Sequence, residues 1–396
     1  MNVERTKGSV LAVALFAMLI LACQSDAVTV AGEPGAPLPG LSEAELDRFH
    51  AGLALFNRIF TPEEGLGPAF NENQCSACHT SPAPGGTTGF ERVVKATRYG
   101  GPGACDLLSE VGGENVRTRS TPLLLEHGVL HETVPPAATD TGRFLPPFLF
   151  GLGLIEAIPE QVIVARSDPE DRDGDGISGR AARGPDGRLT RFGRKADIAT
   201  IEEFTRSALR LEMGLTSRPD DRDQVNGADA PAGTDPMSEP EVDARVVRLL
   251  TDFTRFLVPP ASAPARSEAQ ADTLARGARI FDRLGCARCH TPAMRTGPSD
   301  VPALSQKTIE LYSDLLLHDV GPGLSNVCAH DAAPRELRTT PLMGLQHRGF
   351  YLHDGRAMDL REAILEHGGE AQASRGAFAQ LPWLAQEYVV IFLRSL

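Results

Sequence analysis

Two copies of one five-residue pattern constrain this chain more than any other feature. Residues 75–79 read C-S-A-C-H, the first motif, and residues 286–290 read C-A-R-C-H, the second motif. The pattern C-x-x-C-H attaches a c-type haem: two thiols add to the haem vinyl groups, and the histidine ligates iron through a neutral nitrogen. The sequence therefore predicts two covalently bound haem c groups. The residues that would hold them are Cys75, Cys78, His79, Cys286, Cys289 and His290.

A C-x-x-C pair has two other common uses, as a thioredoxin-like redox centre and as half of a zinc site. Neither explains a histidine directly after the second cysteine in both copies. A four-ligand zinc site would have to join two motifs that lie far apart in the sequence. Haem attachment accounts for every residue of both patterns.

The amino-terminal residues 1–22 are typical of a lipoprotein signal peptide. A charged start precedes an apolar run over residues 10–22, which is shorter than the ~20 residues of a membrane span. Cys23 follows a small residue, as in a lipobox, where the cysteine is acylated and becomes the mature terminus. Ordinary cleavage near Ala27 or Ala31 is the alternative. Both predict export to the periplasm or cell envelope, and the first adds membrane contact through a lipid anchor at Cys23.

Composition narrows the function further. A net charge of -13 argues against nucleic acid as a partner and suits an exported protein that meets small substrates or basic redox proteins. The 30 Pro and 39 Gly, with few aromatic residues, indicate compact domains joined by long irregular connections. The chain is long enough for two domains with hydrophobic cores.

Two cysteines, Cys105 and Cys328, remain after Cys23 and the motif cysteines are set aside. In an oxidising compartment such a leftover pair favours a disulfide. It would link a long insertion in one half of the chain to the other half. Two separate buried thiols are the alternative.

The duplication extends beyond the two motifs. Residues 41–60 begin with a polar cap and continue with apolar residues at helical spacing, and residues 267–284 repeat this plan before the second motif. Each half also closes on an amphipathic segment, residues 246–257 and 385–396. A helix before the haem and another at the end, packed across each other, is the cytochrome c plan.

We therefore predict a mostly α fold with two cytochrome c-like domains, the first enlarged by long loops. Residues 41–260 form the N-terminal haem domain with insertions, and residues 266–396 form the C-terminal haem domain. The linker is marked by Pro259, Pro260 and Pro264.

The enlarged first domain contains both loops and helices. Residues 85–103 and 219–240 are rich in Gly, Pro or Asp, which predicts loops. Residues 148–158 and 201–213 have apolar patterns that predict helices.

Six further segments carry a resemblance to a known family. They are FGLGLIEAIP (150–159), DGDGISGR (173–180), EMGLT (212–216), LHDVG (317–321), LHDGR (352–356) and EHGGE (366–370). Together they resemble the bacterial di-haem cytochrome c peroxidase and MauG superfamily, and within it the di-haem oxidoreductase family once labelled thiol oxidoreductase. The resemblance implies a peroxidase-like oxidoreductase. A small redox protein or other donor would supply electrons at the C-terminal haem, and a small-molecule oxidant such as peroxide would be reduced at the N-terminal haem.

The sixth ligand of the second haem has two candidates. The resemblance assigns this position to His367, and Met343 is the rival because methionine is a standard cytochrome c ligand. His353 matches a position near the haem that hydrogen-bonds without ligating iron, and His318 has a similar status. A turn histidine bonded to the main chain is the alternative for both.

The first haem has His79 and no obvious sixth ligand. The candidates His127 and His131 are four residues apart and share a face if the segment is helical. Splitting a peroxide O–O bond needs a group that takes a proton from one oxygen and returns it to the other, and a shielded carboxylate can do this. The resemblance assigns this catalytic role to Glu212; a solvated carboxylate at a helix end is the alternative.

This chain departs from the family at two positions. The assisting glutamine is missing, and Glu202 and Glu203 occupy its area. The tryptophan between the haems is also missing, because the only tryptophan is Trp383; Phe192 or Arg194 falls in the matching stretch.

An acidic loop follows the start of a calcium-binding pattern. Asp171, Asp173 and Asp175 supply oxygens at its positions 1, 3 and 5, but Ala182 replaces the acid at position 12. Calcium is therefore an expected ligand of an incomplete site, and an acidic turn is the alternative.

Two other functions fit the same motifs. One is a non-enzymatic di-haem electron-transfer cytochrome, and the other is a haem-based redox sensor.

Overall fold

The structure is a computed structural model that describes residues 29–89, 92–219 and 222–396. The predicted signal peptide and Cys23 lie outside this range. Helices take up 32% of the described residues, and strands together with isolated bridges take up 13%, so helix is the commonest regular structure but not the majority. The expectation of a mostly α fold is therefore not confirmed. Within the described residues no helix is both long enough and apolar enough to cross a membrane.

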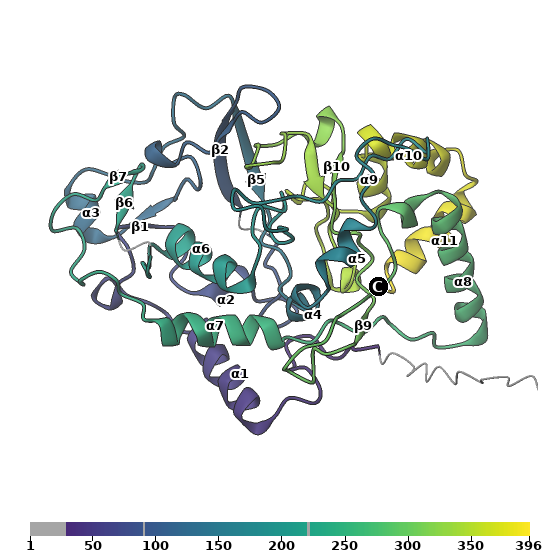
Figure 1. The fold of residues 1–396 in the computed structure, drawn as a ribbon, viewed down its shortest axis with the longest axis horizontal. Coiled ribbons are helices and arrows are strands. Elements are labelled where there is room, and N and C mark those ends of the chain that lie inside the picture. The colour runs from purple at the N-terminus through teal and green to yellow at the C-terminus, as the bar shows by residue number, and fades with distance from the viewer. Residues whose placement is uncertain (1–28, 90–91, 220–221) are drawn as a thin grey trace, which may run out of the picture.

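Two pairs of long helices lie apart in the molecule, α1 (Glu43–Phe56) and α7 (Ala244–Phe256) at the lower left of Figure 1 and α8 (Glu268–Arg283) and α11 (Trp383–Leu393) at its right. Helix α1 packs against α7, and α8 packs against α11. Ser42 starts α1 with a capping box to Glu45, and the Ser267 side chain accepts a hydrogen bond from the Gln270 N–H at the start of α8. The helix expected before each motif, and its crossing with the closing helix, are both observed.

A glycine lies at each crossing. A Cβ on Gly52 of α1 would lie 2.1 Å from the Leu249 carbonyl oxygen of α7, and one on Gly277 of α8 would lie 2.1 Å from the Tyr388 carbonyl oxygen of α11. Only glycine allows the two main chains to approach so closely. The duplication therefore includes the packing of the helices as well as their order.

The shorter helices surround these pairs. They are α2 (Cys75–Cys78), α3 (Pro122–Glu126), α4 (Leu152–Glu156), α5 (Glu160–Val164), α6 (Ile201–Met213), α9 (Leu360–Leu365) and α10 (Gln372–Ala379). The helix predicted over 201–213 is α6. The helix predicted over 148–158 is only α4, because Leu149 donates its N–H to the Gly85 carbonyl and Gly151 has a left-handed φ of 72°.

All of the sheets are small and antiparallel. The three-stranded sheet has the order β3 (Cys105–Asp106), β2 (Val93–Tyr99), β5 (Asp140–Phe144). The two-stranded sheets are β1 (Ala69–Phe70) with β4 (Arg119–Ser120), β6 (Gln224–Val225) with β7 (Ala228–Asp229), β8 (Met294–Arg295) with β9 (Thr308–Ile309), and β10 (Leu317–Asp319) with β11 (Glu336–Arg338).

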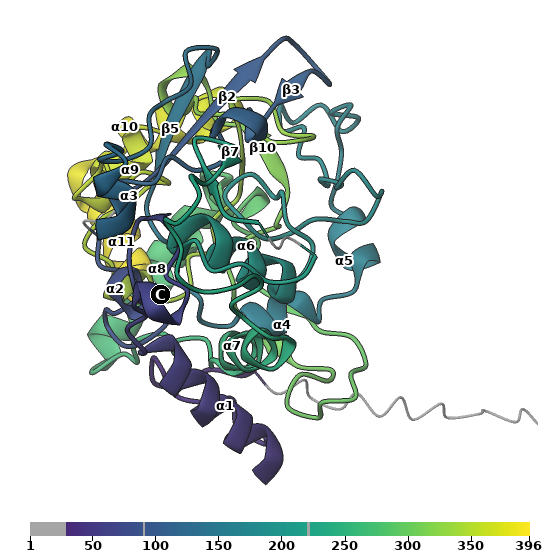
Figure 2. The ribbon, with the colours of Figure 1, turned by 90° about the vertical axis from the view of Figure 1, so that its left-hand side faces the viewer.

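Strand β2 corrects one prediction. It lies inside residues 85–103, which were expected to form a loop. Its partner β5 is distant in the sequence. The β-branched residues of β2 suit a strand, but only pairing with residues 140–144 makes them one. Figure 2 shows this sheet on the side of the molecule opposite α1.

The hydrophobic cores do not follow the two halves strictly. The larger core contains Phe150 and Phe253 from the first half together with Leu311 and Met343 from the second. A separate core lies among α8, α10 and α11, around Phe378. The division into domains at residues 260–266 stays a prediction.

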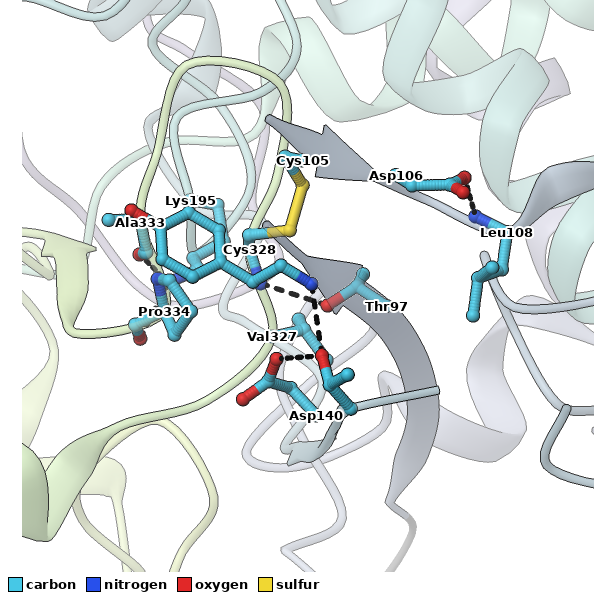
Figure 3. Close-up of a disulfide and its surroundings, with 12 residues drawn as sticks. Thr97, Cys105, Asp106, Leu108, Asp140, Lys195, Val327, Cys328, Ala333 and Pro334 are labelled. Carbon is cyan, nitrogen blue, oxygen red and sulfur yellow. Dashed lines mark hydrogen bonds between the residues drawn. A yellow bond between two sulfur atoms is a disulfide. The ribbon is translucent and has the colours of Figure 1, made fainter. Parts of the chain in front are cut away.

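A disulfide joins Cys105 to Cys328, with 5.8 Å between the Cα atoms (Figure 3). Cys105 lies in β3, and the N–H of Cys328 donates to the Thr97 hydroxyl of β2 at 3.1 Å. The bond therefore ties the three-stranded sheet to the loop that leads into β11. Of the two alternatives for these cysteines, the disulfide is the one observed.

Candidate functional site

The first motif forms the short helix α2 and the residue after it. Its turn carries His79 next to the main chain of Gly86, and the imidazole Nδ1 lies 3.0 Å from the Gly86 carbonyl oxygen. A carbonyl only accepts, so Nδ1 carries the proton and Nε2 keeps its lone pair. The ring centroid of Phe56, from α1, lies 6.2 Å from that of His79.

The second motif repeats this geometry. Its first three residues form a 3-10 turn, and the Nδ1 of His290 lies 3.0 Å from the Tyr312 carbonyl oxygen. The ring centroid of Phe281, from α8, lies 6.4 Å from that of His290. In both motifs a helix brings an aromatic ring to the histidine, and the main chain fixes its tautomer.

The protonation states suit haem attachment. Burial lowers the pKa of His79 and of His290 to about 4, so both imidazoles are neutral at pH 7 and can ligate iron through Nε2. Burial raises the pKa of Cys75 and of Cys286 to about 12, and all four motif cysteines are thiols rather than disulfide partners. A redox-active C-x-x-C pair has the opposite character, a thiol with a lowered pKa. The residues present therefore fit covalent haem.

A mostly apolar cavity, here called the second cavity, opens at the second motif. It is lined by Cys286, Cys289 and His290, and by His367, Phe378 and Leu393 from the C-terminal segments. The Nδ1 of His367 lies 2.8 Å from the Ala363 carbonyl oxygen, so its Nε2 also keeps a lone pair. Burial lowers the pKa of His367 and keeps it neutral. Two neutral imidazoles, those of His290 and His367, thus line one cavity, each with its Nδ1 bonded to a main-chain carbonyl.

The rival ligand Met343 lies elsewhere. It does not line the second cavity and belongs to the larger core, where its sulfur would lie 3.3 Å from a Cβ on Gly151. The methionine is therefore a core residue in this fold.

His318 lines the second cavity between two carboxylates. Its Nε2 lies 2.8 Å from Asp314 Oδ2 and its Nδ1 lies 2.7 Å from Glu370 Oε2. Burial alone would lower its pKa, but the bonds to Asp314, Cys289 and Glu370 outweigh burial and raise the pKa well above its ordinary value. His318 is thus an imidazolium beside the motif thiol of Cys289, and the alternative of a turn histidine bonded to the main chain is wrong.

Glu212 lies in the last turn of α6 and contacts Asn71, a residue just before the first motif. Its Oε2 accepts a hydrogen bond of 2.7 Å from the Asn71 side chain, and its main-chain carbonyl accepts one of 2.7 Å from the Asn71 N–H. Burial raises the pKa of Glu212, while bonds from Asn71 and Asn115 and the charge of Lys95 act in the opposite direction. The alternative of a freely solvated carboxylate does not describe this residue.

The two glutamates in the area of the missing glutamine have other roles. Glu203 belongs to the capping box of α6 with Thr200, and Glu202 forms an ion pair with Arg206 at 2.8 Å. The sequence contained no pattern that singled out Asn71, because it lies far from Glu212 in sequence.

The candidates for the sixth ligand of the first haem do not share a helix. Helix α3 ends before His127, and His131 lies beyond a turn, with its Nδ1 2.7 Å from the Glu132 carbonyl oxygen. Both side chains are exposed. The segment is not helical, so the two histidines do not share a helical face, and their exposure fits two surface residues.

The main chain between Leu145 and Pro147 touches both sites. The Pro147 carbonyl lies near the His79 imidazole and raises its pKa against the effect of burial. The N–H of Leu145 donates to the His353 carbonyl at 2.9 Å, and the Leu145 carbonyl accepts from Arg194 at 3.1 Å. Both His353 and Arg194 line the second cavity. This connection was not predicted, since it joins four separate segments.

The acidic loop lies against the second motif. Asp171, Asp173 and Asp175 each offer a carboxylate oxygen within 4.8 Å of the others. Asp175 also pairs with Arg288, inside the second motif, at 3.1 Å. The buried Ala182 adds no ligand, as the sequence indicated.

A second acidic group went unnoticed in the sequence. Carboxylate oxygens of Asp223, Asp235, Glu239 and Glu241 lie within 4.8 Å of one another, although the residues are spread over a long irregular segment. Burial, followed by the charges of Glu239 and Glu241, raises the pKa of Asp223 to about 9.

The comparisons with known proteins agree with this chemistry. A family model described as "Di-haem oxidoreductase, putative peroxidase" matches residues 141–396, well over half of the chain. No curated protein matches the chain. Among solved structures, the hydrazine synthase of Kuenenia stuttgartiensis is 14% identical, with 100% of each chain covered and a TM-score of 0.42. A MauG-like protein associated with microbial copper homeostasis is 15% identical, with 94% of each chain covered and a TM-score of 0.39. TM-scores this low do not establish a common fold.

Proposed function

The chain belongs to the di-haem oxidoreductase family, and from this premise we propose that it is an exported di-haem c-type cytochrome with peroxidase-like activity. In this proposal electrons enter at the C-terminal haem and pass to the N-terminal haem, where hydrogen peroxide is reduced. Each peroxide takes up two electrons and two protons and leaves as two molecules of water. The electron donor is a small redox protein or another reductant outside the cell membrane.

One asymmetry carries the proposal. The second cavity has two neutral imidazoles, His290 and His367, each with Nδ1 bonded to a carbonyl and Nε2 available to iron. The first motif has one such imidazole, His79, and on its side of the fold a carboxyl group with a raised pKa, Glu212. A haem with two strong axial ligands transfers electrons, whereas one with an open position binds an oxidant.

When bound, each haem supplies an iron that changes oxidation state. The chain supplies the proton chemistry. Glu212 accepts a proton from the peroxide oxygen that is nearer to the haem and donates it to the other oxygen. That second oxygen then leaves as water. The side-chain amide of Asn71 holds the Glu212 Oε2 in one place through a 2.7 Å hydrogen bond. The main-chain N–H of Thr118 donates to the side-chain oxygen of Asn71 at 3.0 Å.

The route between the two sites does not use tryptophan. Trp383 is the only one in the sequence, and it is 67% exposed at the start of α11. We assign the route to the main chain from Leu145 to Pro147, because it touches His79 on one side and His353 and Arg194 on the other.

Two further roles belong to this proposal. Asp171, Asp173 and Asp175 bind calcium, which would brace the second motif through the ion pair of Asp175 with Arg288. The amino terminus directs the chain to the periplasm or cell envelope, where Cys23 carries a lipid anchor.

A spectrum of the ferric holoprotein tests the function. One haem with a high-spin signal that changes on adding peroxide, together with turnover of a reduced donor, is the expected result. Two low-spin haems in every redox state would exclude the enzyme and identify an electron carrier. A high-spin signal that responds to redox state without any turnover would identify a sensor.

A further inference from the structure

We propose that Arg194, Arg348 and His353 bind the two propionate carboxylates of the haem in the second cavity. This inference rests on the proposed function in one respect, the presence of a haem at the second motif. It adds the residues that hold the anionic edge of that haem; of these, the sequence had indicated only that His353 hydrogen-bonds near the haem.

Arg194 is a buried cation that forms no ion pair among the described residues, although the charge of the Asp354 carboxylate acts on it. Its side chain lines the second cavity and the residue is 9% exposed. One terminal nitrogen donates to the Leu145 carbonyl at 3.1 Å and the other to the Thr340 hydroxyl at 3.2 Å. Its Nε is buried and has no hydrogen-bond partner. The guanidinium therefore has a donor left over, and no carboxylate is bonded to it directly.

Arg348 has the same deficit. It lines the same cavity, its Nε is buried without a hydrogen-bond partner, and its guanidinium carbon lies 4.1 Å from the centre of the Phe148 ring. Among the residues that the structure describes, no carboxylate forms an ion pair with Arg194 or Arg348. The two charges also oppose each other: burial lowers the pKa of Arg348 to about 9, and the charge of Arg194 adds to this shift.

His353 adds neutral donor capacity. It is 4% exposed and lines the cavity, and neither ring nitrogen has a hydrogen-bond partner; the nearest carboxylate oxygen, Asp354 Oδ2, lies 3.9 Å from its Nε2. Burial lowers its pKa to about 4, so at pH 7 it offers one N–H without a charge. A buried imidazole with both nitrogens unsatisfied calls for a polar ligand in the cavity.

Arg338, in the same cavity wall, forms no ion pair among the described residues either, but its Nε is hydrogen-bonded. It is 9% exposed, and it donates to the Gly193 carbonyl at 2.8 Å and to the Thr339 carbonyl at 3.4 Å. We therefore do not assign it to the ligand.

Together, these three residues and the apolar lining indicate the chemistry of the ligand. A buried charge without a partner is strongly unfavourable, so two guanidinium groups without an ion pair and an unsatisfied imidazole require an anion. The rest of the lining is mostly apolar, which requires a flat or bulky apolar body attached to that anion. A haem joined by its vinyl edge to Cys286 and Cys289 has this form, with two propionates on its other edge. Bidentate bonds from arginine to carboxylate are also the strongest that these side chains form.

The pH dependence of the second haem's midpoint potential in the holoprotein tests the assignment. Replacing Arg194 by Gln removes the charge that keeps a propionate ionised, so the acid transition in the potential moves up by ~1 pKa unit, about tenfold in proton affinity. Arg348→Gln is expected to act in the same direction. Arg194→Lys restores most of the wild-type curve, and Arg279→Gln, an exposed arginine of α8, leaves the curve unchanged.

Haem content, measured first, separates the possible failures. A wild-type chain with one haem would refute the proposed function, and it would refute this inference as well if that haem were held by the first motif. Two haems with the same transition in wild type, Arg194→Gln and Arg348→Gln would refute the inference alone. A free anion is the other source of the same chemistry: if added phosphate shifts the wild-type potential and Arg194→Gln abolishes that effect, the groups bind phosphate and the propionate assignment is wrong.

Discussion

Asn71 is bonded to Glu212 twice, through its side-chain amide to Oε2 and through its main-chain N–H to the carbonyl, both at 2.7 Å. Asn71 lies just before the first motif, and Glu212 ends the last turn of α6. The two bonds thus join the carboxyl group to the chain that enters the haem-binding turn. A shift of either segment would move the acid relative to the motif.

Replacing Glu212 by Gln should remove the proton transfer and keep the hydrogen bond from Asn71. We expect peroxide turnover to fall by about 10²–10⁴-fold, the usual contribution of a general acid–base group. Haem content and the ferric spectrum should stay as in wild type. Unchanged turnover would rule out the assignment of Glu212.

Replacing Asn71 by Ala should raise the pKa of Glu212 further. The bond from Asn71 lowers this pKa against the effect of burial, so its loss favours the protonated form. A bond to a charged group contributes roughly 1.5–3 kcal/mol, so the acid limb of the turnover–pH profile should move up by about 1–2 units. Asn71→Gln, which keeps the amide, is the control. A profile that does not move in Asn71→Ala would contradict the role of this bond.

Replacing His367 by Ala should open one axial position of the second haem. We expect its low-spin ferric signal to become high-spin. Among the described residues, two other imidazoles line the second cavity besides His290: His318 is charged, and we assign His353 to the propionates, so neither is expected to replace His367. Met343→Ala is the matched control and should leave the spectrum unchanged, since Met343 packs in the larger core. The reverse pattern would make Met343 the ligand.

Replacing Gly277 by Ala should destabilise the packing of α8 on α11. Its new Cβ would lie 2.1 Å from the Tyr388 carbonyl oxygen, and relieving such overpacking typically costs about 1–3 kcal/mol. Gly376→Ala in α10 is the control, because a Cβ there meets nothing within 4 Å. It should stabilise the protein by roughly 0.5–1 kcal/mol. Urea unfolding of the holoproteins measures both, and equal stabilities would contradict the close crossing.

Replacing Asp223 by Asn should stabilise the protein at neutral and mildly alkaline pH. The folded chain holds the Asp223 proton up to a pKa of about 9, whereas the unfolded chain releases it near the ordinary value of 3.8. The folded state therefore binds more protons in this window, and wild-type stability falls as pH rises through it. Thermal unfolding in the presence of a chelator should show a gain for Asp223→Asn at pH 8 that shrinks towards pH 4. A constant difference across this range would contradict the raised pKa.

Much of the helical framework could be read from the sequence because its signals are local. The capping box of Ser42 and Glu45 and the start of α6 at Thr200 involve residues three positions apart. The haem motifs are local as well, since a single turn places each histidine beside its cysteines. For the same reason the duplication was visible before the structure was known.

The strands and the sheets depend on distant partners. Residues 85–103 look like a loop by composition, and they contain β2 only because residues 140–144 pair with it and a disulfide holds the neighbouring β3. Pairing of this kind is a property of two segments at once, and neither segment's composition reveals it.

The sequence by itself determined two C-x-x-C-H motifs, each with its histidine, and the helices that precede them. Only the tertiary structure decided which other groups surround them. It placed Met343 in the core and His367 in the second cavity, bonded Asn71 to Glu212, and left the buried Nε atoms of Arg194 and Arg348 without a hydrogen-bond partner among the described residues. The physical reason is that a motif depends only on neighbouring residues of one segment. The burial of a side chain and the charges around it depend on every segment that the fold brings close to it.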